Sequence, residues 1–120
     1  MKIDTLDGGF TVCKIKDPSC ALRCGTPFFL SITDSEISLV CPTGSAPAET
    51  SSREDGWRCF RVAGKLDFSL TGILSKISGA LAARGIPVFA VSTYDTDYVL
   101  VKEENLGAAL AALADEGFGI

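Results

Sequence analysis

In the second half of the chain, apolar residues follow a helical period in one segment and form strand-like runs on either side of it. Between residues 69 and 84 they follow the i, i+3, i+4, i+7 pattern of one helix face, at Leu70, Ile73, Leu74, Ile77 and Leu81. This spacing predicts a helix that buries one face. Ser69 can accept hydrogen bonds from the free amides of the first turn, and Gly85 can take the left-handed conformation that closes the last.

Strand-like runs surround this predicted helix. Residues 57–62 precede it, and residues 87–92 and 97–102 follow it, separated by a polar turn at 93–96. A last helix is expected from Glu103 to Gly117, and residues 118–120 would add a stub of strand. The order strand, helix, strand, strand, helix predicts an α+β, ferredoxin-like sandwich, in which both helices cover one face of an antiparallel sheet.

The first half of the chain repeats this order in a reduced form. After a lead-in over residues 1–8, strands are predicted at 10–16, 28–32 and 37–41, and the last two form an antiparallel hairpin. Residues 18–26 are too short and too weakly periodic for a helix, and residues 42–54 form a polar connector prone to disorder. We therefore expect a degenerate module at 1–56 and a complete one at 57–120.

The overall charge of the chain argues against nucleic acids and anionic membranes as partners. Eleven basic and fifteen acidic residues give a net charge of -4, so no positive field attracts a nucleic acid or an anionic membrane surface. The chain starts without an apolar signal core, and no stretch reaches the roughly 18 continuous apolar residues of a membrane span. We expect a cytoplasmic protein with neither nucleic-acid nor membrane partners.

The residue types argue against catalysis. The chain has no histidine, no paired-carboxylate motif and no phosphate-binding loop, and a cysteine nucleophile would lack its usual base. The sequence therefore predicts a protein that is not an enzyme and needs no cofactor.

Five cysteines without a secretory signal indicate reduced thiols rather than a disulfide framework. Cys13, Cys41 and Cys59 lie in strand-like runs, where a thiol acts as a small hydrophobic group. Cys20 and Cys24 flank a predicted loop, and a redox or zinc role stays open for them. A zinc site would need two further thiolates from distant strands, so we expect no metal site.

Three segments of the sequence carry a resemblance to a known family: DGWRCFRV, LDFSLTGILS and GIPVFAVSTYDTDYVLV. They resemble the small bacterial ACT-domain proteins related to the CASTOR arginine sensors and to the ACT pair of aspartate kinases. The resemblance is strong over residues 55–116 and looser before them. It implies tandem ACT modules, the first degenerate, in a regulatory homodimer that binds an amino acid or a similar small ligand where two ACT domains meet.

The loop before the predicted helix is the candidate ligand site. The resemblance implies that Asp67 and Gly72 stand where ACT domains place the acidic residue and the glycine of their ligand loop, although Leu70 and Thr71 stand where many relatives have proline. A free amino acid needs amide donors for its carboxylate and an acceptor for its ammonium, which the amides of residues 70–72 and Asp67 would supply. Strand ends nearby add polar side chains. The candidate ligand-binding residues are Asp67, Phe68, Ser69, Leu70, Thr71, Gly72, Ser92, Thr93 and Asp97.

Simpler interpretations of the same residues stay open. Ser69 can be a plain helix cap, and Asp67 can act only by favouring the helix dipole. Gly72 can simply permit the helix to pack closely against the sheet, and residues 93–96 can form an ordinary turn. The function has an alternative as well, a ligand-free interaction or assembly module that keeps only its docking edge.

Overall fold

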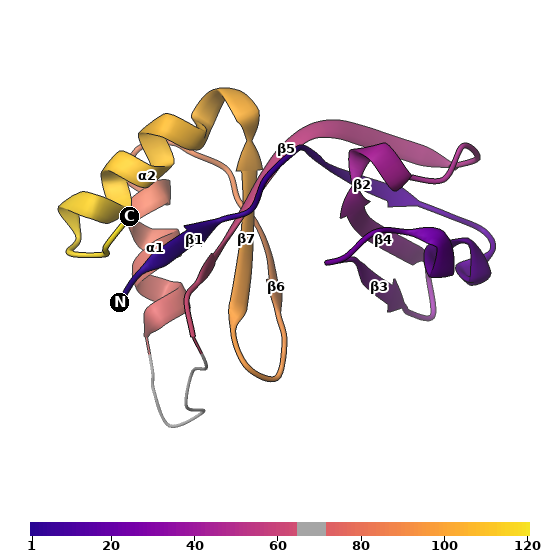
Figure 1. The fold of residues 1–120 in the computed structure, drawn as a ribbon, viewed down its shortest axis with the longest axis horizontal. Coiled ribbons are helices and arrows are strands. Elements are labelled where there is room, and N and C mark those ends of the chain that lie inside the picture. The colour runs from indigo at the N-terminus through magenta and orange to yellow at the C-terminus, as the bar shows by residue number, and fades with distance from the viewer. Residues whose placement is uncertain (65–71) are drawn as a thin grey trace. The chain divides into compact units, whose positions relative to one another are not determined.

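The computed structural model describes residues 1–64 and 72–120, which divide into two compact units (Figure 1). Unit 1 contains residues 1–7 and 58–120, and unit 2 contains residues 8–57. Residues 1–7 therefore belong with the C-terminal part of the chain. The expected modules at 1–56 and 57–120 remain a prediction about how the chain is organised into domains.

Unit 1 is an antiparallel sheet with two helices on one side of it (Figure 1). Its strands lie in the order β1-β5-β7-β6. This is the predicted ferredoxin-like sandwich, and the fold class is confirmed. The elements are β1 (Ile3–Thr5), the end of β5 (Ser52–Val62), α1 (Ile73–Ala82), β6 (Phe89–Ser92), β7 (Asp97–Lys102), the 3-10 turn η3 (Glu103–Asn105) and α2 (Leu106–Asp115).

The short strand β1 completes the sheet of unit 1. Ile3 lies opposite Val62, and its amide donates to the carbonyl of Gly119 over 2.7 Å. Only 3% of Ile3 is exposed. The stub predicted at 118–120 forms a single parallel bridge between Lys2 and Gly119, so the residues expected as a lead-in supply the fourth strand instead.

The core of unit 1 fills the space between the helices and the sheet. The predicted apolar stripe of α1 is confirmed, because Ile77 and Leu81 are buried in this core and Ile73 and Leu74 pack against it. Leu70 lies outside the described residues. The buried members are Ile3, Phe60, Val62, Ile77, Ala80, Leu81, Ile86, Val99, Val101, Ala109, Ala112, Leu113 and Phe118.

The two ends of α1 differ in how well the sequence predicts them. The helix begins at Ile73, and its N-cap is Gly72, with a φ of 79° and no capping side chain. Ser69, the residue predicted to cap this helix, lies outside the described residues. The predicted end is confirmed: Gly85 has a φ of 70°, and the amide of Ile86 donates to the carbonyl of Leu81 over 3.0 Å.

Unit 2 is a four-stranded antiparallel arrangement in the order β3-β4-β2-β5. The predicted hairpin is confirmed, with Ile32 of β3 opposite Ile37 of β4. A small core of its own contains Cys13, Ile15, Ala21, Leu39 and Cys41. The elements are β2 (Phe10–Lys14), the 3-10 helix η1 (Pro18–Arg23), β3 (Phe29–Ile32), β4 (Ile37–Pro42), the 3-10 turn η2 (Thr43–Ser45) and the start of β5.

Two segments of unit 2 are more regular than predicted. The stretch expected to hold no helix contains η1, whose N-cap Asp17 accepts the amide of Ser19 over 2.9 Å. The connector expected over 42–54 ends at Ser52, where β5 begins, five residues before the predicted strand. Residues 52–56 are all exposed, so no alternation of apolar side chains marks them as a strand.

Candidate functional site

A pocket of about 200 Å³ lies in unit 1 at the start of α1. Gly72, Ile73 and Lys76 line it from the helix. The rest of its lining comes from the two ends of the described chain, namely Met1, Glu116, Gly117 and Phe118. The pocket therefore lies where the beginning of one helix meets the end of the other.

Two left-handed glycines shape this pocket. Gly72 turns the chain into α1, and its carbonyl accepts the amide of Lys76 over 2.8 Å. A Cβ added at Gly72 would meet no other atom within 4 Å, so the space beside it is open. Gly117 has a φ of 94° and ends α2, after which the amide of Phe118 donates to the carbonyl of Leu113 over 3.1 Å.

Among the described residues that line the pocket, Lys76 is basic and Glu116 is acidic. The Nζ atom of Lys76 lies 5.5 Å from the centre of the Phe118 ring, a cation–π distance. A zwitterion presents the complementary pair of charges. The volume is below the roughly 300–1,000 Å³ of sites for drug-sized ligands, so it suits a smaller molecule.

Only one of the predicted site residues that the structure describes lines this pocket. That residue is Gly72. The predicted contacts Asp67, Phe68, Ser69, Leu70 and Thr71 lie outside the described residues. Ser92, Thr93 and Asp97 lie instead at the hairpin end between β6 and β7, where Ser92 is opposite Asp97.

The three hairpin residues are engaged in local hydrogen bonds. Ser92 Oγ donates to Asp97 Oδ1 over 2.6 Å, and Thr93 Oγ1 donates to the carbonyl of Thr96 over 3.1 Å. Thr96 itself is 8% exposed, and its hydroxyl donates to the carbonyl of Val62 over 2.9 Å. These contacts order the turn and fasten it to β5.

Sequence reasoning missed Lys76, Glu116 and Phe118. A lysine on the polar face of an amphipathic helix is usually a solvated residue, and Phe118 falls in a three-residue stub. The sequence offers one indication of Lys76: it follows Gly72 by four positions, so the two residues lie on the same side of the helix one turn apart. Glu116 and Phe118 join the site only through the fold.

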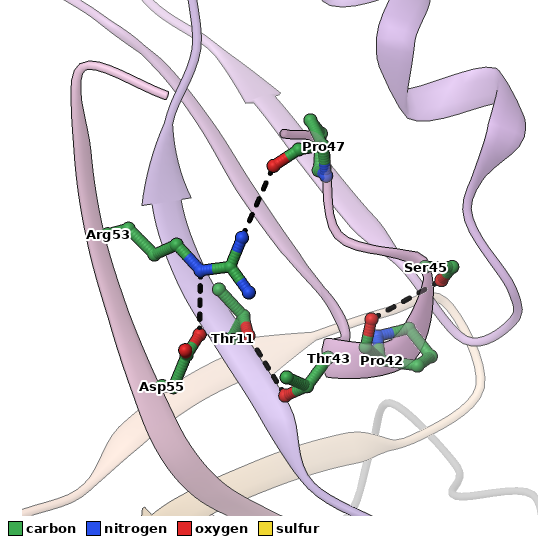
Figure 2. Close-up of polar contacts among 7 residues, drawn as sticks. All are labelled: Thr11, Pro42, Thr43, Ser45, Pro47, Arg53 and Asp55. Atoms are coloured by element: carbon green, nitrogen blue, oxygen red, sulfur yellow. Dashed lines mark hydrogen bonds and ion pairs between the residues drawn. The ribbon is translucent and has the colours of Figure 1, made fainter. Parts of the chain in front are cut away.

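A groove of about 1,030 Å³ lies in unit 2, between η1 and residues 45–51. Arg53 holds the segment 45–51 in place. Its Nη1 donates to the carbonyl of Pro47 over 3.3 Å, and its Nε lies 2.9 Å from Asp55 Oδ1 (Figure 2). The buried Thr11 hydroxyl lies 2.9 Å from that of Thr43 (Figure 2) and donates to Asp55 over 2.6 Å. Charged residues of both signs line the groove at the surface, so its electrostatics favour no particular class of ligand. They are Lys16, Asp17, Arg23 and Glu49.

The strand cysteines are buried, as expected for small hydrophobic groups. Burial raises the pKa of Cys59 to about 12 and, together with the neighbouring Cys24, raises the pKa of Cys41 to about 12. Burial also raises the pKa of Cys13. Among the residues described here, no three cysteine, aspartate or glutamate side chains are arranged to hold a metal ion.

The sandwich fold matches a regulatory class of domain. The model of the ACT domain family matches residues 52–115, which is more than half of the chain. The chain belongs to the ACT domain family, and the resemblance drawn from its sequence is confirmed. In the part of the chain that the structure describes, no helix is long and apolar enough to cross a lipid bilayer.

The curated relatives are named as arginine sensors. The human protein called cytosolic arginine sensor for mTORC1 subunit 1 is 34% identical over 95 residues, which cover 73% of this chain and 29% of that protein. Its mouse counterpart is 35% identical over 95 residues, with 72% and 29% covered. The chain thus spans less than a third of the length of the curated relatives it matches.

Solved structures match nearly the whole chain. A crystal structure of a protein from Agobacterium tumefaciens has a TM-score of 0.87 and 30% identity, and the match covers 98% of this chain and 90% of the other. The ligand-free regulatory subunit of aspartate kinase from Thermus thermophilus has a TM-score of 0.67 and 12% identity, with 96% of both chains covered. The second likeness shows a shared fold.

Proposed function

We propose that this chain is a non-catalytic regulatory domain that binds a free amino acid, or a similar small zwitterion, in the pocket at the start of α1. The observation that carries the proposal is that a basic residue, Lys76, and an acidic residue, Glu116, both line a pocket of about 200 Å³. The curated relatives, named as arginine sensors, support an amino acid as the class of ligand.

Each wall has a defined role in this proposal. The ammonium of Lys76 pairs with the ligand carboxylate, and the carboxylate of Glu116 pairs with the ligand ammonium. Gly72 leaves room for the ligand main chain because it has no Cβ. Residues 67–71, directly before Gly72, remain candidate contacts, and so do Ser92, Thr93 and Asp97.

The proposal includes a cytoplasmic homodimer without a cofactor. Side-by-side pairing of two copies follows from the ACT family resemblance, and the cytosolic location from the name of the curated relatives. Light scattering at micromolar concentration tests the dimer independently of the ligand. If the chain is a monomer at all concentrations, the proposed homodimer is wrong, but the proposed ligand pocket is not affected.

A thermal-shift screen against the twenty amino acids, each at millimolar concentration, tests ligand binding. At least one should raise the melting temperature, because a ligand at a hundred times its Kd adds about 2.7 kcal/mol to the free energy of unfolding. If none of the twenty changes the melting temperature, the proposal is wrong.

Two glycines provide a matched pair of variants for this screen. Gly72→Asp places a carboxylate in the pocket and should abolish the shift. Gly64→Asp is the control, because Gly64 has a similar φ of 86°, has no atom within 4 Å of an added Cβ and does not line the pocket. Both variants carry the same left-handed strain of about 1–2 kcal/mol, so a response retained only in Gly64→Asp identifies the pocket.

An interaction module is the second candidate function, and one observation favours it. Strand β3 ends the strand order of unit 2 and exposes 61% of Ile32 and 37% of Leu30. An apolar edge strand of this kind can add a strand from another protein. A partner that copurifies with the native chain but not with Ile32→Lys, combined with no response to any amino acid, would favour this function over the first.

A further inference from the structure

The two hairpins of the chain share the same register. Each residue of β6–β7 takes the place of the residue sixty positions before it in β3–β4, so that Ala90 corresponds to Leu30 and Ser92 to Ile32. Both hairpins close with a hydrogen bond from the first to the last residue of the turn, 2.9 Å long in the first hairpin and 2.8 Å in the second. Because β3 and β6 each end the strand order of their unit, β6 is an internal reference for β3.

The two edge strands differ in the side chains that they expose. In β3, 37% of Leu30 and 61% of Ile32 are exposed, and the strand FLSI carries no charge. The corresponding residues of β6, Ala90 and Ser92, are also exposed but are small or polar. An exposed apolar edge strand is a place where another chain can pair. The hairpin itself does not require apolar residues at these positions, so their presence in β3 indicates a contact surface.

The backbone of β3 offers hydrogen-bonding groups at the same edge. The carbonyl of Ile37 in β4 accepts the amide of Ile15 over 3.0 Å, so the backbone of Ile37 faces the β2 side. Ile32 lies opposite Ile37 and therefore points its N–H and C=O away from β4, as does Leu30, two positions earlier. In the part of the chain that the structure describes, no hydrogen bond outside the ladder with β4 uses Leu30 or Ile32.

We propose that two copies of this chain pair antiparallel along β3, with Ser31 at the two-fold axis. Leu30 of one copy then lies opposite Ile32 of the other, and each such pair exchanges N–H···O=C bonds in both directions. The four apolar side chains meet on one face of the sheet, because residues two positions apart share a face. This face also carries Leu39, which lies opposite Leu30 and belongs to the core of unit 2.

The sequence around β3 favours a second copy in this orientation. An interface with two-fold symmetry uses the same patch on both partners, and the register about Ser31 pairs both apolar residues within the strand. The turn after β3 carries Asp34 and Glu36. Antiparallel pairing separates these acids to opposite ends of the interface, beside the uncharged residues 26–28, whereas parallel pairing would place like charges side by side.

This inference deepens the proposed homodimer by naming its surface, and the amino-acid pocket of unit 1 does not depend on it. It also assigns a specific partner to the apolar edge of β3, namely the same edge of a second copy. Strand β3 has four residues, so the contact is small and the dimer should be weak, forming between about 10 μM and 1 mM.

An introduced thiol tests the register. Ser31 would face its own counterpart as a non-hydrogen-bonded pair, in which Cα atoms lie about 4.5 Å apart, within the range of a disulfide. The full chain would first carry Cys20→Ser and Cys24→Ser, which remove the half-buried thiols. On mild oxidation with diamide, Ser31→Cys should then give a disulfide-linked dimer on a non-reducing gel. Ala90→Cys, at an exposed position of the reference strand, should remain monomeric.

A matched pair of lysine variants tests the surface without a covalent link. Leu30→Lys and Ala90→Lys each place a lysine at the same exposed position of an edge strand. In sedimentation experiments, the unchanged chain and Ala90→Lys should pass from monomer to dimer over the same concentration range. Leu30→Lys should need a concentration about tenfold higher or more, because pairing would bring one lysine from each copy onto the same face.

Three outcomes would overturn the proposal. They are equal crosslinking of Ser31→Cys and Ala90→Cys, equal dimerisation of Leu30→Lys and Ala90→Lys, and an unchanged chain that stays monomeric throughout. The first two would leave a homodimer that forms through another surface, whereas the third would also contradict the proposed homodimer. The amino-acid screen is read independently of all three, so a failure here is distinguishable from a failure of ligand binding.

Discussion

Lys76 is the residue whose charge the proposed ligand uses most directly. It lies one helical turn after Gly72, on the exposed side of α1, with its ammonium near the Phe118 ring. Sequence periodicity places it correctly on the polar face of the helix. Its role in a pocket depends on Glu116 and Phe118, which are forty or more residues away and which no local pattern associates with it.

Lys76→Gln should weaken amino-acid binding about tenfold, which corresponds to about 1.4 kcal/mol, near the low end for a hydrogen bond to a charged group. Calorimetric titration measures the change. Lys14→Gln is the matched control, because Lys14 is an exposed lysine in unit 2 that lines neither cavity. If Lys76→Gln and the unchanged protein bind the amino acid with equal affinity, Lys76 does not contribute to the site.

The buried thiol of Cys59 predicts a dependence of stability on pH. Burial raises its pKa to about 12 in the folded chain from an ordinary value of 9.0, so only the unfolded chain loses this proton between those values. The free energy of unfolding should therefore be unaffected by this thiol below about pH 9 and fall above it, by about 1.4 kcal/mol per pH unit.

Denaturant titrations at several pH values above 9 check this slope. Cys59→Ala should reduce the slope by the contribution of one thiol, because Cys41, whose pKa is also raised to about 12, still contributes. Identical slopes in the two proteins would show that Cys59 ionises equally in the folded and unfolded chains.

At the scale of elements, the sequence predicted the strongly periodic elements correctly and missed the short or exposed strands. The stripe of α1 and the strands β6 and β7 follow directly from the spacing of apolar residues. Strand β1 has three residues, too few for a period, and the exposed start of β5 has no apolar face. The N-terminal boundary of α1 was missed because the left-handed conformation of Gly72 leaves no mark on the hydrophobic pattern.

Strand β1 should be essential to unit 1 despite its length. Ile3→Ala removes a buried side chain from the core and should lower the free energy of unfolding by about 2–4 kcal/mol. Ile120→Ala, at the opposite end of the chain, is the control, because 54% of Ile120 is exposed. A similar small loss in both variants, measured by urea denaturation, would contradict the role of β1 as the fourth strand.

At the scale of the whole molecule, the chain consists of two units, each with its own core and its own cavity. The ferredoxin-like class could be predicted because the order of elements in residues 57–115 limits the choice of topology. The site could be predicted only in part: the glycine of the ligand loop came from the family resemblance, whereas the charged walls came from residues that the fold brings together.

Arginine is the natural first ligand to test, because the curated relatives are named as arginine sensors.

Nuclear magnetic resonance titration of the labelled chain with arginine, and then with any amino acid that raises the melting temperature, tests the central claim most directly. The account predicts that the amide signals of Gly72, Lys76 and Gly117 shift in a saturable way, while those of Leu39 and Cys41 in unit 2 remain unchanged. Saturable shifts confined to unit 2, or no shifts with any amino acid, would contradict it.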